Sequence, residues 1–153
     1  MILFNPTSAV AQDELSINVS AEVISSIEMI TLKSMRLSGA EANNNIIEID
    51  PTTSANAGKM VAYGTPNSEI RISYLPSREL TRMQGTESLT FNYQIAGNQQ
   101  EDQVSAEIMD VENRDFSFNE DGQFFLWIGG SVNISSAVPG NYQGDFTLEI
   151  EYI

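Results

Sequence analysis

Hydrophobic and polar residues alternate along most of this chain with the period of a β-strand. The clearest run covers residues 145–152, where Phe146, Leu148, Ile150 and Tyr152 are separated by acidic residues and a threonine. Successive side chains of a strand point to opposite faces, so this segment has one apolar face and one polar face. The pattern predicts a half-buried strand that closes the fold and must pair with strands from earlier in the chain.

A second run of the same kind lies near the start of the chain. Its apolar positions are separated by serine, asparagine and glutamate, and they are Leu15, Ile17, Val19, Ala21 and Val23. This spacing predicts another strand with one apolar face. Two alternatives stay open for it. The strand either completes the sheet of its own chain or acts as an arm that is donated to a neighbouring molecule.

Short strand-like segments follow one another between these two runs, and glycine, proline and asparagine mark the turns between them. Residues 27–32 carry apolar side chains on both faces, which predicts a strand covered on both sides or a register shift at a bulge. Residues 77–87 are polar and predict a connection or an edge. The other strand-like segments are 46–50, 60–63, 69–75, 89–95, 123–128 and 131–135, and residues 104–111 could form a strand or a loose turn of helix.

This succession predicts an all-β chain of about 7 to 9 strands in an antiparallel β-sandwich, with a closed barrel as the alternative. Small residues before Gln12 resemble a secretory cleavage site that follows a short apolar head. We therefore divide the chain into a signal-peptide remnant or disordered N-terminus at 1–12, a first strand or donor-strand arm at 13–23, and a sandwich domain at 24–153.

The composition excludes several function classes. The chain has no cysteine and no histidine, which removes disulfides, thiolate metal sites and the commonest general base. Its 21 acidic and 7 basic residues give a formal charge of −14, so the surface repels nucleic acid and anionic membranes. No apolar stretch is long enough for a membrane-spanning helix, so membrane insertion is not expected. An exported protein fits this balance best.

The closing run resembles a known bacterial family. Glycine, aromatic and aliphatic residues alternate over 140–152, after a segment Ser-Val-Asn-Ile at 131–134 and Val-Pro at 138–139. An earlier part of the chain, 58–67 with the isoleucines and Leu-Pro that follow it, adds to the likeness. Residues 15–153 are in this way similar to a bacterial exported family catalogued as domain of unknown function 4402.

The same run resembles the C-termini of chaperone-usher pilus subunits and their spore-coat-like relatives. Tyr152 is the penultimate residue and Gly140 is fourteenth from the end, as in those subunits. The resemblance implies an immunoglobulin-like sandwich with a groove, which a strand from another subunit or from a periplasmic chaperone fills. The candidate complementation residues are then Leu15, Ile17, Val19, Ala21, Val23, Phe146, Leu148, Ile150 and Tyr152.

Two other features of the sequence are candidate sites. The acidic segment 110–122 could bind calcium or carry hydrolytic carboxylates such as Asp110, Glu112 and Asp115, but it lacks the spacing of a calcium loop, which favours a solvated loop. Trp127 with the phenylalanines before it could stack on a sugar, although its apolar surroundings favour a place in the core.

The function expected from the sequence is a non-enzymatic structural or adhesive subunit of a secreted or surface bacterial assembly, without a cofactor. Its partner would be a protein, either another copy or a periplasmic chaperone. The alternative is a monomeric secreted binding module for glycan or another cell-surface ligand.

Overall fold

The computed structural model describes residues 14–23, 26–39, 42–110 and 114–153. These residues form strands and turns, and no helix in this part is long and apolar enough to cross a membrane. The strands are β1 (Glu14–Val23), β2 (Glu28–Lys33), β3 (Met35–Ser38), β4 (Ile46–Ile49), β5 (Gly58–Tyr63), β6 (Glu69–Tyr74), β7 (Ser77–Arg82), β8 (Ser88–Asn98), β9 (Glu107–Ile108), β10 (Asp115–Ser117), β11 (Gln123–Asn133) and β12 (Tyr142–Tyr152).

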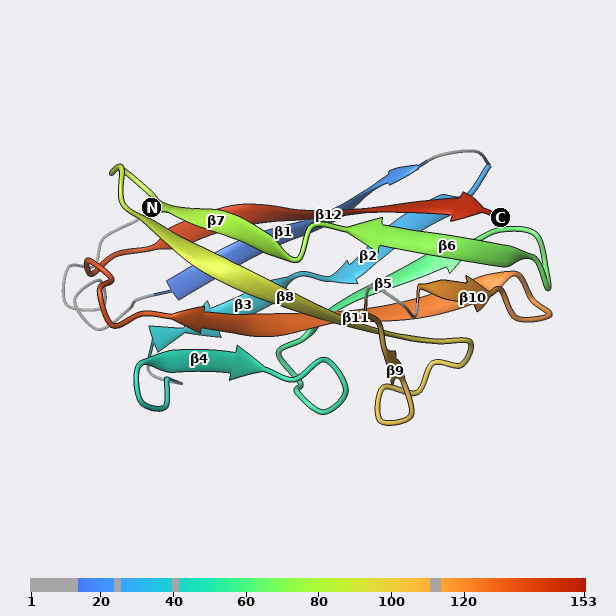
Figure 1. The fold of residues 1–153 in the computed structure, drawn as a ribbon, viewed down its shortest axis with the longest axis horizontal. Coiled ribbons are helices and arrows are strands. Elements are labelled where there is room, and N and C mark those ends of the chain that lie inside the picture. Colours follow the sequence, from blue (N-terminus) through green and yellow to red (C-terminus); the bar gives the residue numbers. More distant parts are fainter. Residues whose placement is uncertain (1–13, 24–25, 40–41, 111–113) are drawn as a thin grey trace.

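The strands form one hydrogen-bonded path that folds over into two layers (Figure 1). One layer has the order β3-β1-β12-β6-β10, and the other has the order β7-β8-β11-β5-β2. The short strands β4 and β9 pair with β11 and β8 in the second layer. The prediction of an all-β chain with a sandwich-like or barrel-like arrangement is confirmed.

The chain crosses between the layers at two bends. β2 pairs with β5 in the second layer, and β3, one residue later, pairs with β1 in the first. β6 pairs with β12 in the first layer, and β7, which follows Leu75 and Pro76, pairs with β8 in the second. Proline lacks the N–H that a ladder needs, so the strand bends there. These bends join the two layers along their edges.

Residues 77–82, expected as a connection or an edge, form the strand β7 at the edge of the second layer, and only Leu80 is fully buried in it. The described residues contain twelve strand segments where about 7 to 9 were expected, because bends divide two long strands and short strands add to the count. The segment 27–32 shifts register after Thr31, as one of the two alternatives predicted, and the other, a strand covered on both sides, is wrong because its outer side chains are exposed.

β11 runs without a break through Gly129 and Gly130, where the sequence predicted two separate strands. A side chain at Gly130 would place its Cβ 2.0 Å from the Asn92 carbonyl oxygen of β8, and its φ of +141° is one that other residues rarely adopt. The glycines are therefore needed for close strand approach within β11, where the partner on one edge changes from β5 to β4.

Tyr93 has the only buried side-chain polar atom without a hydrogen-bond partner in the part of the chain that the structure describes. Its ring packs against Phe91 and Phe146, with centroid distances of 4.7 and 4.5 Å. Burial raises the pKa of the Tyr93 hydroxyl to about 12, against an opposing effect of the Arg78 charge. The core thus contains a hydroxyl group that makes no hydrogen bond.

Replacing Tyr93 with phenylalanine is expected to raise the free energy of unfolding by about 1 kcal/mol, because a buried group without a partner is removed. The variant should also lose less stability in alkali. The hydroxyl stays protonated up to about pH 12 in the folded chain but ionises near pH 10 when unfolded. Ionisation of this hydroxyl therefore has no effect on stability below pH 10, and above pH 10 it lowers the free energy of unfolding of the natural chain by at most about 1.4 kcal/mol per pH unit.

Urea unfolding between pH 8 and pH 11.5 measures both effects, and Tyr142→Phe is the matched control. The Tyr142 hydroxyl donates to the Val138 carbonyl at 2.9 Å and accepts from the Val138 N–H at 3.1 Å. Its loss should therefore lower the free energy of unfolding by about 1 kcal/mol. Equal destabilisation by the two substitutions would contradict the assignment for Tyr93.

Candidate strand-complementation site

β12 provides one wall of the candidate site. Its alternate residues Tyr142, Phe146, Leu148 and Ile150 are at most 2% exposed, and the residues between them are polar or glycine and mostly exposed. This is the two-faced strand that its sequence predicts. On one edge β12 pairs with β6 and β7, which leaves the other edge for β1.

β1 lies between β12 and β3 and is paired on both of its edges. It runs parallel to β12, from Leu15 opposite Tyr142 to Val23 opposite Ile150. Its first four residues, Glu14–Ile17, pair antiparallel with β3. Figure 1 shows β1 and β12 side by side and pointing the same way. We call the space between β3 and β12 that β1 fills the β1 slot.

The apolar face of β1 points into the core. Leu15, Ile17 and Val19 are 2%, 0% and 5% exposed. The backbones of Ala21 and Val23 pair with Leu148 and Ile150, and the side chains of these two residues lie outside the described part. The structure thus brings the predicted first and last strands together within one chain, in the self-paired arrangement of the two alternatives left open by the sequence.

The direction of this pairing differs from the expected antiparallel sandwich. Every other strand pair in the described part is antiparallel, whereas β1 and β12 are parallel. Parallel neighbours need a long connection, and here that connection is nearly the whole domain. The sequence shows which residues alternate, but not the direction in which a distant partner runs.

Beyond Ile17, β1 no longer pairs with β3, and its backbone is held by a side chain instead. The Thr31 hydroxyl of β2 donates to the Val19 carbonyl at 2.7 Å. On the outer face, the Asn18 amide donates to the Asp145 carboxylate at 3.3 Å. The slot is therefore closed by three strands: β12 and β3 through backbone ladders, and β2 through one hydroxyl.

Tyr152 lies at the end of the sandwich, away from the slot. It pairs with Ile70 of β6, and its hydroxyl accepts a hydrogen bond from the Thr65 N–H at 2.9 Å. The Thr65 hydroxyl, 3.2 Å away, is the main cause that lowers the pKa of Tyr152 below its ordinary value. Among the predicted residues, Tyr152 thus anchors the turn before β6 and takes no part in holding β1.

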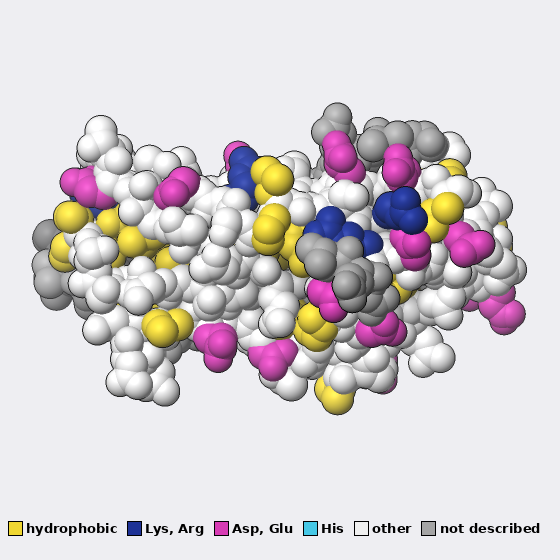
Figure 2. All heavy atoms as spheres, viewed as in Figure 1, with side chains coloured by type: hydrophobic (Ala, Val, Ile, Leu, Met, Phe, Trp, Pro, Cys, Tyr) yellow, Lys and Arg dark blue, Asp and Glu magenta, His cyan; other side chains and the backbone are white. Residues whose placement is uncertain are grey.

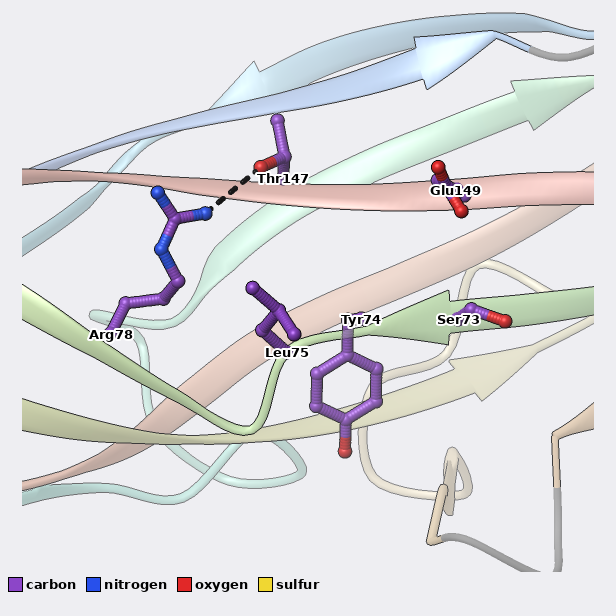
Figure 3. Close-up of a pocket in the computed structure, with 6 residues that line it drawn as sticks. All are labelled: Ser73, Tyr74, Leu75, Arg78, Thr147 and Glu149. Atoms are coloured by element: carbon purple, nitrogen blue, oxygen red, sulfur yellow. Dashed lines mark hydrogen bonds between the residues drawn. The ribbon is translucent and has the colours of Figure 1, made fainter.

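A shallow hollow lies where β6 passes into β7. It has a volume of ≈ 300 Å³ and is lined by Ser73, Tyr74, Leu75, Arg78, Thr147 and Glu149. Figure 3 shows Arg78 extending from β7 to Thr147 of β12, a hydrogen bond of 3.3 Å, and Tyr74 extending to the opposite side. β12 pairs with β7 only up to Gln143 and with β6 only from Leu148, so the hollow marks a gap in this ladder.

The acidic segment 110–122 does not form a metal centre among its described residues, where no group of three or more carboxylates is placed to hold an ion. Asp115 instead accepts two hydrogen bonds from Arg71, at 2.7 and 2.9 Å, and these hold the pKa of the carboxyl below its ordinary value. Glu112 lies outside the described residues. Figure 2 shows acidic side chains spread over the visible face, with apolar ones in small separate groups.

The aromatic run before Gly129 belongs to the core. Phe124, Phe125 and Trp127 are 1%, 7% and 4% exposed, so these rings offer no open platform for a sugar. Trp127 is covered by Lys59, whose ammonium lies 5.8 Å from the ring centroid and pairs with Glu101. The core interpretation of this run is confirmed.

Comparisons with known proteins give no relative to guide the assignment. No family model matches the chain, and no curated protein matches it either. The case for a function therefore depends on the slot and on the residues that form it. Sequence reasoning missed the contributions of β3 and of Thr31, because their contacts with β1 depend on bends that no local pattern predicts.

Proposed function

We propose that this chain is a non-enzymatic structural or adhesive subunit of a secreted or surface bacterial assembly, and that its subunits join by β-strand complementation at the β1 slot. The observation that carries this is the place of β1. It is the first described strand of the chain, yet it is paired on both edges inside a layer and buries Leu15 and Ile17 in the core. Its removal would leave a groove between two strands, which an extended segment of another molecule can fill.

Two further features support the proposal. β1 and β2 pair with strands of different layers, so β1 can leave its layer without removing β2 from the other. The resemblance of residues 15–153 to domain of unknown function 4402, and of the closing run to chaperone-usher pilus subunits, supports an immunoglobulin-like sandwich, export through the periplasm and assembly through a chaperone. A head-to-tail exchange of β1 would produce an open polymer.

The second candidate is a monomeric secreted binding module with glycan as its ligand. It is favoured by the pairing of β1 with its own chain, which leaves no open slot in a single molecule. In that case β1 is an ordinary strand of a complete domain.

Deletion of residues 1–23, with and without a synthetic peptide of residues 13–23, separates these candidates. A complementation subunit is expected to stay folded and soluble only when the peptide or another partner strand is supplied. A self-complete module should unfold in both cases. Size-exclusion chromatography and circular dichroism measure the outcome. A full chain that is a compact monomer and never captures the peptide would contradict assembly. An activity that is lost on replacing Asp110, Glu112 or Asp115 would instead support an enzymatic function.

A further inference from the structure

Gly58 lies across the sandwich from β1 and leaves room for one of its side chains. It opens β5 and pairs with Ile128 of β11. A Cβ added to Gly58 would lie 3.3 Å from Val19 Cγ2, 3.4 Å from the Lys33 carbonyl oxygen and 3.6 Å from Ile128 Cβ. The φ of Gly58 is not among the positive values found in this chain. The glycine at this position is therefore explained by the space that Val19 needs, and not by a backbone conformation with a positive φ.

Thr31 contacts the backbone of the same residue, Val19. Its hydroxyl donates to the Val19 carbonyl at 2.7 Å, in the stretch where β1 has passed the end of its ladder with β3. Leu15 and Ile17 differ in this respect, because their backbones pair with β3 on that edge. Val19 also faces Phe146, which is fully buried, across the ladder with β12. Its side chain thus lies between Gly58 and Phe146, and its carbonyl is held by Thr31.

We infer that Gly58 forms a selectivity seat for the Val19 position of any strand that fills the β1 slot, and that Thr31 binds the backbone of that position whatever its side chain. The seat restricts this position to valine or a smaller residue. The partner is an extended segment with large apolar residues at its first and third positions and a valine at its fifth. Residues 15–19 of a second copy of this chain meet that requirement. The inference rests on the proposed function, because it describes what the same slot selects.

The seat can be tested by enlarging the side chain at position 58 of the full chain and shortening the side chain at position 19 of a peptide that fills the slot. Two labelled peptides of residues 13–23, one natural and one with Val19→Ala, are mixed with the unaltered chain and with its Gly58→Ala variant in mild urea. Fluorescence anisotropy gives their apparent affinities. The chain's own β1 competes equally with both peptides, so the ratio of the two affinities isolates the seat.

The unaltered chain is expected to bind the natural peptide about tenfold more tightly, because Val19→Ala leaves a cavity. Gly58→Ala should lower this ratio by about tenfold, since the added methyl overpacks valine but fits beside alanine. Thr31→Val should weaken both peptides by about fivefold, the loss of one hydrogen bond, with the ratio unchanged. A Leu15→Ala peptide is the control and should lose affinity equally for the unaltered chain and the Gly58→Ala variant.

The possible failures are distinguishable. Capture of both peptides with the same ratio in the unaltered chain and in Gly58→Ala overturns the seat and leaves the proposed function standing. Capture of neither peptide, under conditions in which the chain itself exchanges β1 reversibly, overturns both. Urea unfolding of the Gly58→Ala and Val19→Ala chains and of the double variant supplies a second measurement, in which strictly additive effects also overturn the seat.

Discussion

Replacing Ile17 with aspartate is expected to lower the free energy of unfolding by about 4 kcal/mol or more, which approaches the total stability of many domains. Ile17 is 0% exposed and faces the core from β1, opposite Gly144 of β12 and Met35 of β3. No charged side chain is among the buried residues of the described part, so a carboxylate at this position would be buried without compensation. The aspartate is expected to drive β1 out of the slot, and urea unfolding measures the loss.

Ser20→Asp is the matched control, because Ser20 is exposed on the opposite face of the same strand. Its effect should stay within about 0.5 kcal/mol. If the slot accepts strands from other molecules, the Ile17→Asp chain should also capture the natural 13–23 peptide more tightly than the unaltered chain does. Loss of structure that the peptide does not restore would indicate that β1 is integral to a self-complete fold.

Gly130→Ala is expected to produce the second large effect, a loss of about 2 to 4 kcal/mol in the free energy of unfolding. The new Cβ would lie 2.0 Å from the Asn92 carbonyl oxygen, so β8 and β11 would have to separate at the centre of their ladder. The φ of +141° adds backbone strain for any residue with a side chain. Thermal and urea unfolding measure the change.

The neighbouring Ser131→Ala serves as its control, since Ser131 is only partly buried and has an ordinary backbone. Its cost should be about 0.5 kcal/mol or less. A Gly130→Ala chain as stable as this control would show that the strands adjust freely at this point, and the continuous path of β11 through both glycines would then need another explanation.

Alternation was enough to predict the strands that carry the candidate site. β1 and β12 both have one apolar and one polar face, and their core residues are the ones that the pattern selected. Period-two alternation reports burial directly, because each strand of a sandwich has one face on the core. Phe124, Phe125 and Trp127 were likewise predictable as core, from an apolar run with no polar interruption.

The parts that could not be predicted depend on contacts between distant segments. β7 has Leu80 as its only fully buried residue, so its sequence lacks the alternation of a half-buried strand and predicts a connection or an edge. Its strand conformation comes from pairing with β8 and β12. Gly129 and Gly130 look like a turn, and only the close approach of a neighbouring strand makes them part of β11. The seat at Gly58 and the Thr31 hydroxyl lie on the paired strands β5 and β2, and Val19 of β1 meets them only after the sheet folds over.

The parallel pairing of β1 with β12 has a consequence for the order of events during folding. Residues in contact there, such as Asn18 and Asp145, are 127 positions apart. Contacts across such separations form late and slowly, because closing a long loop costs entropy before any contact compensates it. β1 is therefore synthesised well before β12, the strand beside which it belongs. During that interval its apolar face is accessible, and any molecule that binds extended segments can reach β1 before β12 does.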